Sequence, residues 1–121
     1  MGFLFVALGG ALGACGRYAI SLIPVRTQFP YLTLITNLLG ALLIGFIVGA
    51  ADGKSSKNAM LFWKTGVCGG FTTFSTFSLE AYELFEKGAY LTGALYAVLS
   101  VSVCLLGVLI GKKLSLLITG H

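Results

Sequence analysis

The sequence predicts an all-α membrane protein with four transmembrane helices, the third of them broken in the middle of the membrane. Of the 121 residues, 57% are hydrophobic and 10% are charged, whereas a soluble domain has about 25% charged residues. A spanning helix needs roughly 20 apolar residues, so the length suffices for four spans and leaves nothing for a soluble domain. We expect one membrane domain over residues 1–121, with spans at about 3–23, 31–51, 59–86 and 89–117.

Charge and cysteine placement argue against several other classes of protein. The net charge of +4 is modest and falls mostly at the ends of the apolar segments, which indicates headgroup contact rather than nucleic-acid binding. The three cysteines, Cys15, Cys68 and Cys104, lie inside apolar segments, which predicts buried thiols and neither disulfides nor a metal site. The single histidine, His121, is the last residue and receives no role. No catalytic motif is present, so we expect no enzyme.

The first segment, residues 3–23, carries a stripe of small residues. Gly9, Gly13 and Gly16 share one face, and such a stripe lets helices approach closely. Arg17 follows near the end of the stripe. Its side chain either extends to the membrane interface or lends positive potential to an anion vestibule, because an intramembrane charge usually marks a pathway.

The second segment, residues 31–51, has one strongly polar residue. Asn37 shares a face with small residues at steps of four. Its amide either joins helices or donates its NH2 group to an anion that is losing its water shell. The sequence pattern alone leaves both readings open.

The third segment, residues 59–86, contains the most informative stretch of the chain. At residues 69–80 a glycine pair is followed by five hydroxyl side chains and a carboxylate. Unpaired backbone in hydrocarbon costs several kcal/mol per group, and discontinuous helices are how transporters build ion sites. We therefore expect a break near residues 69–73. The alternative is a helix kinked at Gly69-Gly70, with its hydroxyls bonded back to its own carbonyls.

Aromatic and hydroxyl side chains alternate after the predicted break. Phe74 and Phe77 share a helix face, and Thr76 shares another with Glu80. An aromatic pair at this spacing usually packs in a core, but a ring also has a positive edge that can face an anion. The opened backbone at residues 69–72 would expose carbonyl oxygens, which suit a hard cation such as Na⁺.

The fourth segment, residues 89–117, follows a turn at Lys87-Gly88. It places Tyr96, Ser100 and Cys104 at steps of four. Hydroxyls on a membrane helix most often bond their own backbone. Aligned with Thr76 and Asn37, however, they would form a polar track.

The distribution of basic residues favours both termini on the cytoplasmic side, though only slightly. Arg26 and Lys87 lie on the opposite side, joined by Arg17 if it reaches the surface. The side with the termini holds five lysines, namely Lys54, Lys57, Lys64, Lys112 and Lys113. By the positive-inside rule this difference leaves insertion in both orientations open. Since no internal repeat is visible, we expect a four-span chain with an enclosed pathway to dimerise.

Residues 69–80, GGFTTFSTFSLE, resemble the signature of the Fluc (CrcB) family of fluoride channels. Two further motifs match in the expected order: the glycines at 9, 10 and 13 with Gly16-Arg17-Tyr18, and the run TLITNLLG at residues 33–40. The resemblance covers essentially the whole chain, and the motif at 69–80 is its most specific part.

The resemblance implies an antiparallel dual-topology dimer with two fluoride pores and one structural Na⁺ at the dimer interface. The fluoride pathway would be formed by Asn37, Phe74, Phe77, Ser75, Thr76, Tyr96 and Ser100. The backbone carbonyls of Gly69 and Thr72 would hold the Na⁺, and Arg17 and Glu80 would lie in the vestibule. Where the family leads us to expect another serine on the fourth helix, this chain has Cys104, and Ser102 lies on another face.

The implied function is passive export of cytoplasmic fluoride across the inner (plasma) membrane, which relieves toxicity. Its partners would be fluoride, the lipid bilayer, and a second copy of the chain or a paralogous subunit. One rival is a small dual-topology multidrug exporter, but the glutamate such proteins need in the first span is absent. The other rival is a non-transporting membrane scaffold subunit, which would leave the hydroxyl and phenylalanine run without a role.

Overall fold

The computed structural model describes residues 1–51 and 53–120, in which helices are joined by short loops and no strand occurs. Asp52, in the predicted loop, and His121 lie outside the described residues. Three long helices are unbroken: α1 (Gly2–Ser21), α2 (Tyr31–Ala51) and α6 (Tyr90–Thr119). Between α2 and α6 come four shorter pieces: α3 (Lys57–Met60), the π-helix η1 (Leu61–Cys68), α4 (Gly69–Phe71) and α5 (Phe74–Glu86).

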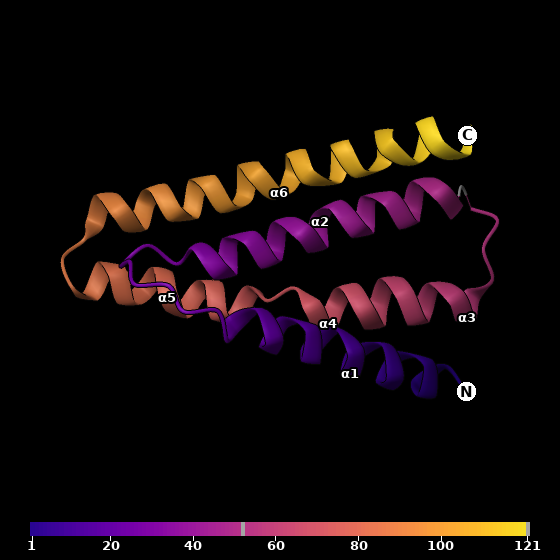
Figure 1. Cartoon of the computed structure of the whole chain (residues 1–121), viewed down its shortest axis with the longest axis horizontal. Coiled ribbons are helices and arrows are strands. Elements are labelled where there is room, and N and C mark those ends of the chain that lie inside the picture. Colours follow the sequence, from indigo (N-terminus) through magenta and orange to yellow (C-terminus); the bar gives the residue numbers. More distant parts are fainter. Residues whose placement is uncertain (52, 121) are drawn as a thin grey trace.

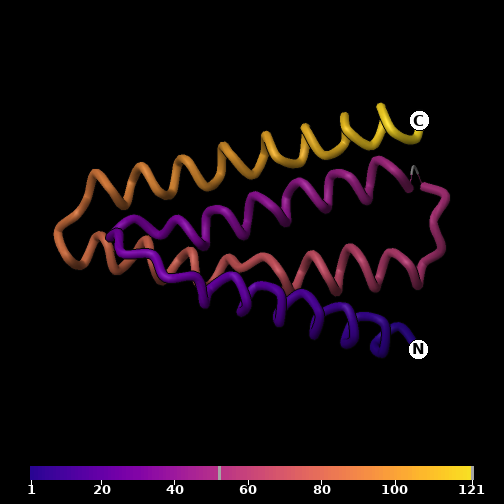
Figure 2. Tube along the Cα trace, viewed as in Figure 1, coloured from indigo at the N-terminus to yellow at the C-terminus, as the bar shows by residue number. Residues whose placement is uncertain are grey.

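The segments run lengthwise beside one another (Figure 1, Figure 2). Both termini lie at one end of the molecule, together with the connection between α2 and α3. The connections from α1 to α2 and from α5 to α6 lie at the other end. The chain therefore passes four times along its long axis, as the predicted four spans require.

Three of the predicted spans are helices long and apolar enough to cross a membrane. Their mean hydropathies are 1.6 for α1, 2.2 for α2 and 2.4 for α6. The predicted bounds of α2 match the observed ones, because Pro30 ends the preceding loop directly before the first helical residue. The third pass is assembled from pieces that are each too short to span alone.

The break in the third pass lies at Thr72 and Thr73, within the predicted range of 69–73, and the alternative of a helix kinked at Gly69-Gly70 is wrong. Gly69 is helical, with φ −63° and ψ −37°. The chain becomes extended only at Thr72, with ψ 159°, and at Thr73, with φ −149° and ψ 116°. Of the two glycines, Gly70 has a packing role. A Cβ atom on Gly70 would lie 2.5 Å from the carbonyl oxygen of Gly10.

The predicted glycine stripe of α1 packs against η1 and α4. A Cβ on Gly9 would meet the carbonyl oxygen of Phe62, and one on Gly13 would meet the carbonyl oxygen of Val67. A second close pair joins α2 to α6, where Gly45 faces the backbone of Val108. Small residues thus let the backbones touch within each of two helix pairs.

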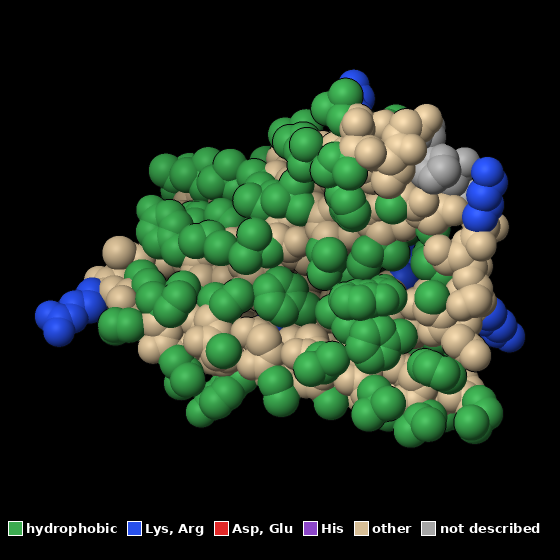
Figure 3. All heavy atoms as spheres, turned by 45° about the vertical axis from the view of Figure 1, so that its right-hand side comes forward, with side chains coloured by type: hydrophobic (Ala, Val, Ile, Leu, Met, Phe, Trp, Pro, Cys, Tyr) green, Lys and Arg blue, Asp and Glu red, His purple; other side chains and the backbone are tan. Residues whose placement is uncertain are grey.

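Most of the apolar surface stays uncovered in the single chain. Only 11% of the spanning window of α1 is buried, and 22% of those of α2 and α6. Figure 3 shows hydrophobic side chains spread over the visible face, with lysines and arginines confined mainly to its edges. An apolar surface of this extent must be covered by lipid or by another protein chain.

Candidate functional site

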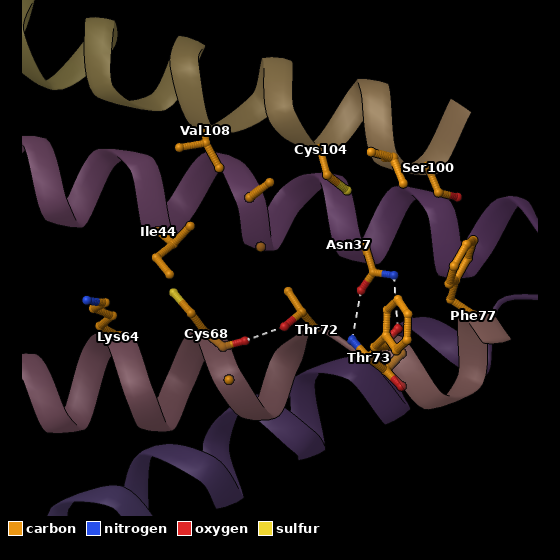
Figure 4. A pocket seen from close by; sticks show the side chains of 15 residues that line it. Asn37, Ile44, Lys64, Cys68, Thr72, Thr73, Phe77, Ser100, Cys104 and Val108 are labelled. Carbon is orange, nitrogen blue, oxygen red and sulfur yellow. Dashed lines mark hydrogen bonds between the residues drawn. The ribbon is translucent and has the colours of Figure 1, made fainter. Parts of the chain in front are cut away.

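Asn37 on α2 braces the break in the third pass. Its Oδ1 accepts a hydrogen bond from the backbone N–H of Thr73 at 2.8 Å, and its Nδ2 donates to the carbonyl oxygen of Thr73 at 3.1 Å (Figure 4). One amide thus satisfies both backbone groups of a residue that has left the helix. Because the Thr73 N–H points to Asn37, it no longer donates to the carbonyl of Gly69, four residues earlier.

Threonine side chains close the two helix ends at the break. Thr73 is the N-cap of α5, and its Oγ1 accepts from the N–H of Thr76 at 3.1 Å. The same oxygen lies 3.3 Å from Oγ of Ser75. On the other side, Thr72 donates its hydroxyl to the carbonyl of Cys68 at 2.9 Å. The hydroxyl of Thr72 therefore bonds to a carbonyl of its own helix, as the alternative reading of the sequence expected.

Arg17 is tied to the helix before the break. Its Nε donates to the carbonyl oxygen of Gly70 at 3.2 Å. The guanidinium therefore joins α1 to α4 instead of extending freely to the interface. Arg17 also lines a small cavity of about 70 Å³, whose other walls are Ser21, Leu32, Thr33, Thr36, Thr73 and Thr76.

Tyr96 on α6 is fully buried and bonded to a carboxylate. Its hydroxyl donates to Oε1 of Glu80 at 3.1 Å. The rings of Phe77 and Phe29 lie 5.1 Å and 5.4 Å from its own, centroid to centroid. Phe74 lies 5.6 Å from Phe77 and is 78% exposed in the single chain. The aromatic run therefore begins at the buried Tyr96 and ends on an open face.

A larger cavity of about 380 Å³ lies between α2, α6 and the broken segment (Figure 4). It brings together six of the predicted site residues, namely Asn37, Phe74, Phe77, Ser100, Gly69 and Thr72. Its walls also contain Gly40, Ala41, Ile44, Lys64, Cys68, Thr73, Val101, Cys104 and Val108. Of the other predicted residues, Thr76 and Arg17 line the small cavity. Ser75 is exposed, and Tyr96 and Glu80 pair with each other.

Ser100 stands out in the wall of the larger cavity. It is 6% exposed, and its Oγ has no hydrogen-bond partner among the described residues. Sequence reasoning missed Thr33 and Thr36 of the small cavity, which are 8% and 3% exposed. The two threonines are three residues apart, which places them on one helix face just before Asn37, and this pattern could have identified them.

The cysteines do not share one environment. Cys68 is buried and Cys104 is half-buried, and both line the larger cavity. Cys15 is exposed, so the prediction of a buried thiol is wrong there. The reason is geometric, since α1 turns its glycine face toward η1 and Cys15 lies on another face. Among the described residues no cluster of three or more His, Cys, Asp or Glu side chains exists that would hold a metal ion.

These features define a multi-pass membrane protein whose third helix is interrupted, with a polar brace at the interruption, inside an otherwise apolar bundle. Residues 4–112 match the family model described as CrcB-like protein, Camphor Resistance (CrcB). The chain belongs to this CrcB family, as the motif at 69–80 predicts.

Relatives at 44–46% identity span nearly the full chain. A protein of Rhodopseudomonas palustris (strain BisB5) is 44% identical, covering 98% of this chain and 100% of the relative. One from Clostridium perfringens (strain 13 / Type A) is 46% identical over 93% and 91%. One from Methanococcus maripaludis is 44% identical over 93% and 94%. Each of these relatives is named fluoride-specific ion channel FluC.

Proposed function

We propose that this protein is a fluoride-selective passive channel that exports cytoplasmic fluoride across the inner membrane. The observation that carries the proposal is the cavity beside the Asn37-braced break, where phenylalanine rings and an unpaired hydroxyl meet in one space. We infer that the ion is fluoride because the relatives are named fluoride-specific ion channels. A family of this kind performs conduction, not catalysis.

The cavity offers neutral donors to a small anion. Phe74 and Phe77 line it, and the edges of their rings carry partial positive charge that can face an anion. Asn37 uses one Nδ2 hydrogen for Thr73, so the second hydrogen remains for an ion. The hydroxyl of Ser100 is also available. Such groups replace water around fluoride without the tight hold of a full positive charge, and conduction requires weak enough binding for release.

Backbone carbonyls at the break also suit a bound Na⁺. The carbonyl of Gly69 has lost its helical donor, and the extended backbone at Thr72 marks the C-terminal end of α4, where the helix dipole is negative. Both residues line the larger cavity. Hard cations prefer oxygen ligands, and unwound carbonyls with half-helix ends coordinate Na⁺ in transporters.

Two carbonyls from one chain do not complete the shell of a cation. We therefore propose that a second, antiparallel copy supplies the matching pair and also covers the exposed face of Phe74. The large uncovered apolar surface supports such a partner. The Na⁺ would then be structural and lie on the axis between the subunits.

An inside-negative membrane potential is sufficient to drive export. One charge moved across 100 mV corresponds to about 2.3 kcal/mol, which is roughly a fortyfold to fiftyfold concentration ratio at about 1.4 kcal/mol per decade. A passive path therefore clears fluoride without ATP or proton coupling.

Fluoride efflux from liposomes tests the function directly. Purified protein is reconstituted with internal potassium fluoride, valinomycin is added, and external fluoride is followed with an electrode. We expect rapid fluoride release, and no chloride release from vesicles loaded with potassium chloride. Absence of fluoride release from folded protein, also after co-reconstitution with a paralogous chain, contradicts the proposal.

A further inference from the structure

Cys104 places a free thiol in the same cavity as the predicted fluoride-pathway residues. Its side chain lines the cavity together with Asn37 and Phe77. In Figure 4 the sulfur points from α6 into the space above the broken segment. A thiol differs from the hydroxyl expected there in being a strong nucleophile once it is deprotonated.

The hydroxyl of Ser100, one helical turn earlier, independently indicates a guest in this space. Ser100 is 94% buried, since it is 6% exposed, and its Oγ is unpaired. A buried polar atom without a partner costs about 1–3 kcal/mol, and such atoms in native proteins are normally satisfied by water or an ion. Since Ser100 and Cys104 line one cavity, a small molecule that reaches Ser100 also reaches the thiol.

We propose that Cys104 is a modification site within the ion path, open to small uncharged soft electrophiles, and that its adduct blocks conduction. This proposal rests on the channel function proposed above. The reagent is uncharged because the cavity walls are mostly apolar, and an uncharged molecule enters such a space without losing the hydration of a charge. The adduct blocks because it sets an apolar group in front of Ser100, where the ion needs a donor.

Methyl methanethiosulfonate is the probe for this chemistry. The Cys104 sulfur attacks the sulfenyl sulfur of the reagent and forms a disulfide bond that carries a methylthio group. The bond between the sulfenyl and sulfonyl sulfurs breaks, methanesulfinate leaves with the electron pair, and the thiol proton passes to water. Dithiothreitol reverses the modification by thiol–disulfide exchange.

The test uses a chain whose only cysteine is Cys104, made by Cys15→Ser and Cys68→Ala, beside the unaltered chain and a control chain that adds Cys104→Ser to those two changes. The control must lack Cys68 as well, because Cys68 lines the same cavity. Fluoride efflux from liposomes is measured before reagent, after reagent and after dithiothreitol, and intact mass reports the adduct. We expect efflux to fall roughly tenfold or more in the first two chains, an added barrier of about 1.4 kcal/mol, and to recover with dithiothreitol. The control chain should keep its own starting rate after reagent.

Two results overturn the proposal while leaving the channel function standing. One is unchanged efflux from protein whose Cys104 carries the adduct. The other is failure of Cys104 to react in liposomes in which Cys15 of the unaltered chain does. Peptide mass mapping of the unaltered chain decides this second point even if the single-cysteine chain does not fold. Absence of fluoride efflux before any reagent instead overturns the channel function, and this proposal with it.

Discussion

A single amide holds the two halves of the third pass in register. Asn37 satisfies both backbone groups of Thr73, while Thr73 itself caps the next helix through its side chain. The sequence marks Asn37 as the polar residue of its segment and Thr73 as one of five hydroxyl residues in 69–80, but nothing in the pattern pairs two residues that lie 36 positions apart. The pairing depends on how α2 docks beside the break, which is a tertiary property.

Removing the amide should destabilise the break. In Asn37→Ala the N–H and C=O of Thr73 lose their partners, and each unpaired buried group costs about 1–3 kcal/mol. We expect a lower free energy of unfolding in lipid or detergent, measured by denaturant titration. Asn58→Ala, at an exposed position of α3, is the matched control and should leave stability unchanged. Equal stability of both variants contradicts the bracing role.

The rings should matter for conduction more than for folding. Phe77→Ile keeps an apolar side chain of moderate size but removes the ring edge from the cavity. We expect fluoride efflux to be abolished while the protein still elutes as the native assembly on size exclusion, and we expect the same of Phe74→Ile. Phe3→Ile, on a side chain that is 92% exposed, serves as control and should retain efflux. Undiminished efflux from both cavity variants removes the ring-edge proposal.

At the scale of elements, glycines place the broken segment against α1. The sequence located α1, α2 and α6 because each is one long apolar run. It placed the break within residues 69–73, because adjacent glycines there signal loose backbone and hydroxyl side chains follow them. In the structure the missing side chain of Gly70 allows close approach to α1, and the backbone opens two residues later, where Asn37 and Thr73 pair. Local propensity therefore identified the region of the break, and packing fixed its position.

Two neighbouring glycines of α1 give a matched test of this packing. A Cβ on Gly13 would clash with the carbonyl of Val67, whereas a Cβ on Gly10 meets nothing within 4 Å. We expect Gly13→Ala to lower thermal stability and fluoride efflux, because α1 must move away from η1 and α4. Gly10→Ala should behave like the unaltered protein in both measurements. Similar behaviour of the two variants would show that the close contact carries no energetic weight.

At the scale of the whole molecule, the single chain leaves its candidate site incomplete. Phe74 is 78% exposed, and Gly69 and Thr72 line the larger cavity without a second set of oxygen ligands among the described residues. The sequence predicted dimerisation from the need for an enclosed path, and this remains a prediction. Cys15 shows the limit of the composition argument, since apolar surroundings in the sequence did not determine which side of α1 is covered.

Removing sodium should impair the assembled channel. We propose that the carbonyls of Gly69 and Thr72 hold a structural Na⁺. Without the ion, these carbonyl oxygens would repel those of the second subunit across the interface, and the pore residues should move out of position. We expect fluoride efflux to fall after exhaustive exchange into N-methyl-D-glucamine buffer and to recover on return of Na⁺. A parallel exchange into Na⁺ buffer controls for handling. Full efflux after the exchange contradicts the sodium site.

The brace between Asn37 and Thr73 also has a consequence for biogenesis. The chain order puts α2 before the broken segment, so the ribosome makes the amide before the two threonines. Until the segment docks beside α2, the backbone of Thr73 has no partner in the lipid except its own helix. We therefore expect the nascent segment to insert as a continuous helix and to open only on docking. This makes the interruption a product of assembly, formed after insertion and not during it.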